Sequence, residues 1–216
     1  MIESHKEYLL SIKPTIDITS YYGTILWIDD DTCIDIQLED IYLYEFEYMY
    51  PNMILDLFEE GIEDIPMEVY TRLKNFLLNE KILKQTLSED EFKKERGWIN
   101  SIYGTFSLKS CIPGLIRSYL SLIYQDLKIR SSLQYESNNF IYIDTDMFFT
   151  KKQIKFESPL PIKMSKIPFA YFRDKRRYVY FNGEEIKYKS SRKDDDLLNI
   201  LKPAIRNYKI GKIQTN

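Results

Sequence analysis

The sequence predicts an α+β protein in which helices interrupt an antiparallel sheet. With 44 % hydrophobic and 15 % aromatic residues, the 216-residue chain can bury a core, which excludes wholesale disorder. Runs of strand-forming residues precede and follow a long helical stretch, an order typical of α+β proteins. An acidic turn separates two candidate strands in each of the β-rich parts, and this pattern predicts two hairpins.

The first β-rich part is expected to contain three strands. Residues 24–28 and 33–38 are predicted to form a hairpin around the turn at 29–32, and residues 41–50 form the third strand. Pro51-Asn52 is expected to break this strand. The first helix then begins at Met53 and ends near Gly61.

Helical spacing dominates the middle of the chain. One helix is expected to begin near Pro66, and Ser88 followed by Glu91 is the capping-box pattern that opens another. Pro113-Gly114 opens a further helix through about Arg130. Residues 140–143 and 147–149 then predict the second hairpin, and the pattern beyond it is mixed.

Composition excludes several classes of site. Two cysteines and one histidine, His5, cannot build a disulfide framework, a zinc site or a Ser-His-Asp triad, and no Gly-rich phosphate loop is present. Any chemistry should rest on carboxylates, metal, or Tyr, Lys and Arg. No secretory signal and no apolar run of about 18 residues is visible, so we expect a soluble intracellular protein of the cytoplasm or nucleoid, without a membrane partner.

Charge is divided unevenly along the chain. Residues 1–150 hold 13 basic and 26 acidic residues, whereas residues 151–216 hold 17 basic and 7 acidic. The basic runs 175–178 and 187–193 are interleaved with Tyr and Ser, which suits a nucleic-acid backbone. A solvated face, or a docking surface for an acidic partner, is the alternative interpretation.

Three segments carry residue types suited to phosphoryl transfer. Asp144 and Asp146, two residues apart, can present their carboxylates to one Mg²⁺ site. Glu45 precedes a strand-to-helix turn whose backbone N–H groups could hold a triphosphate. Arg96 begins a helical stripe, continued by Asn100 and Tyr103, that suits phosphate, polar and stacking contacts with a nucleotide. Taken singly, each segment also fits an ordinary acidic turn, amphipathic strand or packed helix.

In order and spacing, these segments resemble the three polymerase motifs of the family B DNA polymerases. Residues 45–54 align with Asp-Phe-x-Ser-Leu-Tyr-Pro-Ser-Ile-Ile and match it at Phe46, Tyr50, Pro51 and Ile54. Residues 96–104 align with Lys-x-x-x-Asn-Ser-x-Tyr-Gly, and residues 142–146 match Tyr-x-Asp-Thr-Asp. Residues 175–178 resemble a later Lys-Lys-Arg-Tyr segment. The resemblance covers about residues 20–195, most of the chain.

The resemblance implies a polymerase palm-like antiparallel sheet flanked by helices, with a short helical fingers insertion and neither an exonuclease domain nor a full thumb. Residues 1–58 would be the first part of the palm and 59–106 the fingers insertion. Residues 107–190 would be the rest of the palm, and 191–216 a basic C-terminal segment or thumb stub.

The resemblance also implies roles for individual residues. Two Mg²⁺ ions, with Mn²⁺ as an alternative, would be held by Glu45, Asp144 and Asp146. The dNTP would contact Tyr50, Arg96, Asn100 and Tyr103. Primer–template DNA would contact Lys175, Arg176, Arg177, Tyr178, Arg192 and Lys193. The implied reaction is attack of a primer 3′-hydroxyl on the α-phosphate of the dNTP.

Several positions depart from the family pattern. Glu45 is one methylene longer than the usual Asp, Arg96 replaces Lys, and Met147 replaces the Ser after Asp-Thr-Asp. The chain is also much shorter than family members. Two hypotheses follow: a catalytic subunit whose exonuclease and thumb come from other chains, or a non-catalytic DNA-binding or assembly subunit. A protein-interaction domain is a third alternative, and the template could be DNA or RNA. The Ile/Lys/Asn/Tyr-rich composition fits an AT-rich, virus-encoded gene.

Overall fold

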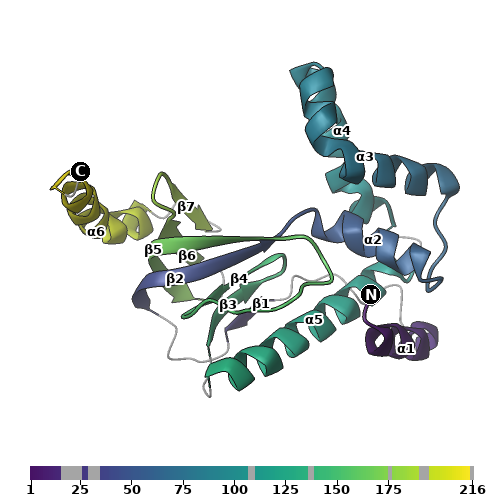
Figure 1. Cartoon of the computed structure of the whole chain (residues 1–216), viewed down its shortest axis with the longest axis horizontal. Helices are drawn as coiled ribbons and strands as arrows, with labels where there is room; N and C mark the ends of the chain where they lie inside the picture. Colours follow the sequence, from purple (N-terminus) through teal and green to yellow (C-terminus); the bar gives the residue numbers. More distant parts are fainter. Residues whose placement is uncertain are drawn as a thin grey trace. The chain divides into compact units, whose positions relative to one another are not determined.

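The computed structural model describes residues 1–15, 26–28, 35–106, 110–135, 139–174, 177–189 and 195–214. The chain forms two compact units. Unit 1 comprises Met1–Gly23, Glu47–Asp126 and Ser158–Pro161, and unit 2 comprises Thr24–Phe46, Leu127–Glu157 and Ile162–Asn216. The mixture of helices with an antiparallel sheet confirms the predicted α+β class (Figure 1).

Unit 1 is helical. Its described elements are α1 (Glu3–Ile12), a 3₁₀ turn (Lys13–Thr15), α2 (Met49–Glu59), α3 (Met67–Thr86), α4 (Glu89–Phe106) and the first part of α5 (Ile112–Tyr135), which continues into unit 2. Helices α2, α3 and α4 contact one another through apolar side chains that are almost fully buried, among them Met53, Leu57, Leu73, Phe76 and Ile99. The order of the helices in the middle of the chain agrees with the sequence pattern.

The start of α4 confirms the predicted capping box. The Ser88 backbone N–H donates to Glu91 Oε2 at 3.0 Å, and the Ser88 hydroxyl donates to the same carboxylate at 2.6 Å. The Glu91 N–H in turn donates to Ser88 Oγ at 3.4 Å. These bonds satisfy amide groups that the first turn of a helix leaves without intrahelical partners.

The expected start of the first helix at Met53 is wrong, because α2 begins four residues earlier at Met49. Pro51 therefore lies in the first turn of α2 and does not break the chain there. This position tolerates proline, since the first amides of a helix need no intrahelical acceptor. Tyr48 precedes α2 with a left-handed backbone (φ 46°), which turns the chain sharply out of the preceding strand.

Unit 2 is built on a seven-stranded sheet in which every described pair is antiparallel. Its strands are β1 (Leu26–Ile28), β2 (Ile36–Phe46), β3 (Phe140–Asp144), β4 (Met147–Thr150), β5 (Ile162–Asp174), β6 (Arg177–Phe181) and β7 (Ile186–Lys189). Their order in the sheet is β1-β3-β4-β2-β5-β6-β7, so the long β2 lies between β4 and β5. The predicted hairpin of β3 and β4 is confirmed.

The predicted first hairpin and third strand are wrong. Strand β1 pairs with β3, not with the segment that follows it, and the turn at 29–32 lies outside the described residues. Residues expected to form two strands, 33–38 and 41–50, contribute instead to the single strand β2. Asp40 adopts φ 53°, which interrupts the regular backbone of β2. Its neighbours Glu39 and Ile41 pair with Phe169 and Ile167, the residues on either side of Pro168.

The two faces of the sheet bury different clusters. One cluster combines Ile41 and Leu43 of β2 with residues of the other central strands, including Ile141, Phe149 and Tyr178. A second cluster joins β5 and β6 to α6 (Asp195–Gln214) through Tyr171, Val179, Phe181, Leu197 and Leu201. Because both clusters pack against the sheet, they hold in place the strands whose ends carry polar residues.

Candidate active site

Three carboxylates lie around the tip of the β3–β4 hairpin in unit 2. Asp144 ends β3, Asp146 lies in the turn, and Glu45 approaches the hairpin from the adjacent β2. In the sheet register, Met147 is directly opposite both Asp144 and Glu45. Strand β4 therefore lies between Asp144 and Glu45. Since neighbouring strands are about 4.8 Å apart, the backbones of these two residues are about 10 Å apart. The Phe46 N–H also donates to the Asp146 carbonyl at 2.8 Å, which ties the turn to β2.

The turn between the two aspartates has an uncommon backbone. Thr145 adopts φ 51°, a left-handed conformation that is unfavourable for a β-branched residue. Thr145 and Asp144 are buried, whereas Asp146 is exposed. The turn thus directs its second carboxylate toward solvent and its first into the protein.

Asp144 already has two partners. The Lys189 ammonium on β7 forms a hydrogen-bonded ion pair with Asp144 Oδ2, and the Tyr178 hydroxyl donates to the same oxygen at 3.3 Å. The Asp144 side chain is 3 % exposed, and that of Lys189 is 46 % exposed. Burial raises the pKa of Tyr178 far above its usual value, and the Asp144 charge adds to the effect. Asp144 therefore serves as an acceptor for two groups of the protein itself.

Asp146 and Glu45 have different surroundings. Desolvation by the surrounding protein raises the pKa of the Asp146 carboxyl although the residue is exposed, and the charges of Asp144 and Glu45 add to this rise while Lys189 opposes it. Burial raises the pKa of Tyr180 to about 12, and the nearby Glu45 charge contributes. Glu45 is half-buried on the same side of the sheet as Tyr180.

The donor chemistry of Glu45 and Asp146 suits a hard divalent cation, which prefers carboxylate oxygens. Asp144 fits such an ion less well, because Lys189 and Tyr178 occupy one of its two oxygens, Oδ2. Within the described ranges, no group of three or more His, Cys, Asp or Glu side chains is arranged to hold a metal. Glu45 and Asp146 are therefore the two carboxylates here whose chemistry suits such an ion.

The predicted nucleotide-contacting residues belong to unit 1. Tyr50, in the first turn of α2, stacks on Tyr103 of α4, with ring centroids 4.2 Å apart and an interplanar angle of 25°. Arg96 and Asn100, both exposed, share the helix α4 with Tyr103, so the helical stripe expected from their spacing has formed. The structure thus brings together two aromatic rings and a helix face that carries a cation and an amide.

Tyr48 links the start of α2 to α3. Its hydroxyl donates to Glu80 Oε1 at 2.5 Å, and burial raises its pKa to about 12, with Glu80 adding to the rise and Arg96 opposing it. The Tyr48 side chain therefore has a structural contact, and Arg96 lies close enough to affect it electrostatically.

The predicted DNA-contacting residues are only partly described. Lys175, Arg176, Arg192 and Lys193 lie outside the described residues. Arg177 forms an ion pair with Asp174 at 2.6 Å, and Tyr178 is 3 % exposed and bonded to Asp144. Sequence reasoning did not single out Lys189, although it lies in the basic run 187–193, because its partner is reached only through the pairing of β7 with β6.

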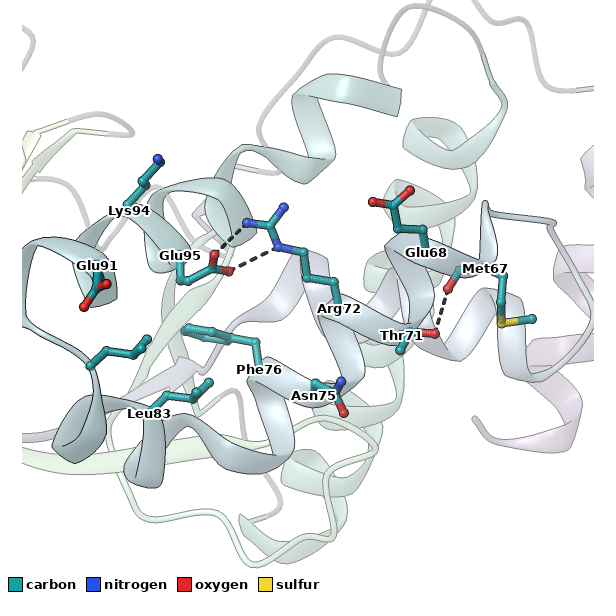
Figure 2. Close-up of a pocket in the computed structure, with 11 residues that line it drawn as sticks. Met67, Glu68, Thr71, Arg72, Asn75, Phe76, Leu83, Glu91, Lys94 and Glu95 are labelled. Carbon is teal, nitrogen blue, oxygen red and sulfur yellow. Dashed lines mark hydrogen bonds and ion pairs between the residues drawn. The ribbon is translucent and has the colours of Figure 1, made fainter.

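The larger of the described pockets lies elsewhere, between α3 and α4 of unit 1 (Figure 2). It has a volume of about 860 Å³, and its wall includes Phe76, Leu83 and the Arg72–Glu95 pair, which is bonded twice, at 2.7 and 3.2 Å. The Arg72 guanidinium also lies 3.9 Å from the centre of the Trp98 ring. None of the predicted site residues lines this pocket.

No helix in the described part of the chain is both long enough and apolar enough to span a membrane.

Comparison with known proteins finds similarity in fold. No family model matches the sequence, and no curated protein matches it. The structure is similar to the family B DNA polymerase of the hyperthermophilic archaeon Pyrobaculum calidifontis, with a TM-score of 0.52 and 16 % identity over 81 % of this chain and 29 % of that one. It is also similar to Phi29 DNA polymerase complexed with primer–template DNA, with a TM-score of 0.52 and 10 % identity over 92 % of this chain and 56 % of that one.

A second structure of Phi29 DNA polymerase, complexed with single-stranded DNA, gives a TM-score of 0.50 and 12 % identity over 90 % of this chain and 55 % of that one. This chain therefore spans between 29 % and 56 % of the length of these polymerases. The α+β fold, with an antiparallel sheet flanked by helices, is that of a polymerase palm-like structure.

Proposed function

We propose that the chain carries the nucleotidyl-transfer centre of a divergent, family B-like DNA polymerase. The observation that carries the proposal is the position of Glu45 on β2 beside the Asp144–Asp146 hairpin, two segments about 100 residues apart in sequence that meet in one sheet. In the proposed reaction a primer 3′-hydroxyl attacks the α-phosphorus of a dNTP. The new P–O bond replaces the bond to the β-phosphate, and pyrophosphate leaves.

Glu45 and Asp146 are the residues that would hold Mg²⁺. When bound, the ion would neutralise charge on the reacting phosphates. This would lower the barrier to attack by the primer 3′-hydroxyl. Asp146 is exposed to solvent and can receive a ligand, whereas Asp144 holds Lys189 and Tyr178 beside the hairpin. We therefore assign Asp144 mainly to positioning, although the family pattern implies a metal ligand there.

The helical unit would bind the nucleotide. The exposed Arg96 offers a cation for the triphosphate, and Asn100 offers an amide one helical turn away. The stacked Tyr50 and Tyr103 rings present a flat apolar surface suited to a sugar or base. Such groups accelerate the reaction by positioning the substrate and by stabilising charge as it develops.

The proposed partners are those of a polymerase palm and fingers region. We propose that exonuclease and thumb functions, supplied by other chains, complement the region described here. Primer–template DNA is the proposed polymeric substrate, in keeping with the nucleic acids in the two Phi29 complexes.

A second candidate is a non-catalytic subunit that binds DNA or assembles a replication or transcription complex. The ion pair between Lys189 and Asp144 favours it, because a cation of the protein already neutralises one of the three carboxylates. The longer Glu45 side chain also changes the geometry of any metal shell, and Mg²⁺ tolerates little geometric error.

Primer extension separates the two functions. The chain, alone and with its co-purifying partners, is given Mg²⁺, dNTPs and a primer on either a DNA or an RNA template. The Asp146→Ala variant is compared with Asp40→Ala, which removes an exposed carboxylate elsewhere in the same unit. Extension that is lost only in Asp146→Ala supports catalysis. Absence of extension with salt-sensitive primer–template binding supports the second candidate, and undiminished extension by Asp146→Ala contradicts the proposed site.

A further inference from the structure

A basic surface that the sequence motifs do not include lies where α5 ends against the connection from β4 to β5. Gln134 and Tyr135, the last residues of α5, contact residues 153–155 of this connection. All of these residues belong to unit 2. We define this loop–helix surface by its four exposed basic residues, Arg130, Lys151, Lys152 and Lys155.

The connection has no regular secondary structure, but side chains hold its backbone in place. Asn139 accepts from the Lys152 N–H at 2.7 Å and donates to the Lys152 carbonyl at 3.0 Å. Gln134 makes the same paired contact with the backbone of Lys155, at 3.0 and 2.5 Å. Between these anchors, the Ile154 N–H donates to the buried Tyr44 hydroxyl at 2.8 Å.

These anchors fix the backbone from which Lys152 and Lys155 project, and both side chains, like that of Lys151, are exposed. Lys152 extends along the Tyr135 ring, with Nζ 5.3 Å from the ring centre. Arg130 precedes Gln134 by four residues on α5, and so lies one turn away on the same helix face. The anchored backbone thus keeps the attachment points of the cations in place, which lowers the backbone entropy lost when a ligand binds.

Among the described residues, the cations of this surface differ in their partners from four other basic residues of unit 2. Lys166, Arg177, Lys187 and Lys189 each form an ion pair with a carboxylate. In contrast, the described part of the chain offers no carboxylate within ion-pair distance of the four residues of the loop–helix surface. In sequence, two acidic residues adjoin these four cations: Glu157, which is exposed, and Glu136, which lies outside the described residues.

We propose that the loop–helix surface is a second nucleic-acid contact of this chain, which binds the phosphodiester backbone without reading its sequence. Three exposed lysines on an anchored backbone, with an exposed arginine on the adjoining helix, suit a polyanion of phosphates. The exposed neighbour Gln153 adds a hydrogen-bonding side chain. The surface uses none of the residues assigned to nucleotidyl transfer, although a nucleic-acid partner is also what the proposed function requires.

The expected contribution follows from counterion release. Each lysine–phosphate contact adds about 0.7 to the slope of log affinity against log salt for a single strand, and about 0.9 for a duplex. Loss of three lysines should therefore reduce the slope by about 2 for a single strand and by about 3 for a duplex. At ~0.1 M salt, the same loss weakens single-strand binding about 100-fold.

Lysine footprinting of the wild-type chain tests the location directly, without metal, dNTP or turnover. The chain is acetylated with and without a 20-nucleotide single strand or its duplex, and each lysine is followed by mass spectrometry. We expect several-fold slower acetylation of Lys151, Lys152 and Lys155 with DNA bound, and no change at Lys81, Lys84 and Lys93 of unit 1. Equal acetylation of the three surface lysines with and without DNA would overturn the proposal, whatever primer extension shows.

Matched variants test the energetics. Lys151, Lys152 and Lys155 are changed to Gln in one variant, and Lys81, Lys84 and Lys93 are changed to Gln in the control, so that net charge changes equally. We expect the decrease in salt slope only in the first variant, with unchanged melting temperature in both. An equal decrease in both would reveal a net-charge effect and refute a local site. If the first variant still binds DNA as the wild type does but no longer binds polyglutamate, the surface is a site for an acidic protein instead.

The single-strand and duplex arms identify the form of nucleic acid. Primer extension that fails while the footprint persists would reject the proposed catalysis and leave this surface intact. A missing footprint together with Asp146-dependent extension would reject this surface and support the proposed catalysis. The failures of the two proposals are therefore distinguishable.

Discussion

Replacement of Lys189 by Met should destabilise unit 2 by leaving the Asp144 carboxylate buried without its cation. The Asp144 side chain is 3 % exposed, and the remaining donor, the Tyr178 hydroxyl, is 3.3 Å away. At an ordinary separation of ~3 Å and an effective dielectric constant of about 20, Coulomb attraction amounts to roughly 5 kcal/mol. Because the Lys189 side chain is 46 % exposed, solvent screening lowers this by about half, and we expect a loss of about 2–3 kcal/mol.

The assay is urea denaturation in a double-mutant cycle. Lys189→Met, Asp144→Asn and the double variant are compared by circular dichroism at neutral pH. If the ion pair is the cause, the double variant recovers most of the stability lost in Lys189→Met, because no buried charge is left unpaired. A loss below about 0.5 kcal/mol in Lys189→Met, or energies that simply add in the double variant, would refute the reasoning.

Three further predictions concern the scaffold. Burial raises the pKa of Asp56, so the native state takes up a proton more readily than the unfolded chain, and stability falls as pH rises from the ordinary carboxyl range through this raised pKa. Asp56→Asn should remove that fall and raise the melting temperature at neutral pH, and an unchanged pH profile of thermal unfolding would contradict this. Ser88→Ala breaks the capping box with Glu91 and should cost about 1 kcal/mol in urea denaturation, whereas Ser88→Asp should restore most of it. Phe148→Ala removes a fully buried ring stacked 4.7 Å from Tyr44 and should cost about 3–5 kcal/mol, and a loss below 1 kcal/mol would mean that the ring is not in the core.

The sequence was most informative where local chemistry decides the structure. The hairpin of β3 and β4 followed from two apolar runs around an acidic turn, and the start of α4 followed from Ser88 and Glu91. The helix stripe of Arg96, Asn100 and Tyr103 followed from their spacing. In each case, neighbours within a few residues determine the result.

Errors arose where a distant partner decides the structure. Periodicity predicts that residues 24–28 and 33–38 are strands but does not identify their neighbours, and β1 pairs with β3 across more than 100 residues. Residues 33–38 and 41–50 are predicted to be separate strands. Instead, β5 places Pro168 opposite Asp40, so that the two irregular residues face each other within one long strand pair. The contact of Lys189 with Asp144 likewise depends on three consecutive pairings along β5, β6 and β7.

The central position of β2 has a consequence for synthesis of the chain. Its two partners, β4 and β5, both begin about 100 residues after β2 ends. At a translation rate of about 5–20 residues per second, β2 emerges at least ~5 s before either partner exists. During that interval both of its hydrogen-bonding edges lack their native strands, and an 11-residue strand with free edges is prone to pair with other chains. Helices α2 to α5, translated in the interval, can fold from local contacts alone, so we expect the helical unit to form first and the sheet, with its carboxylates, to close last.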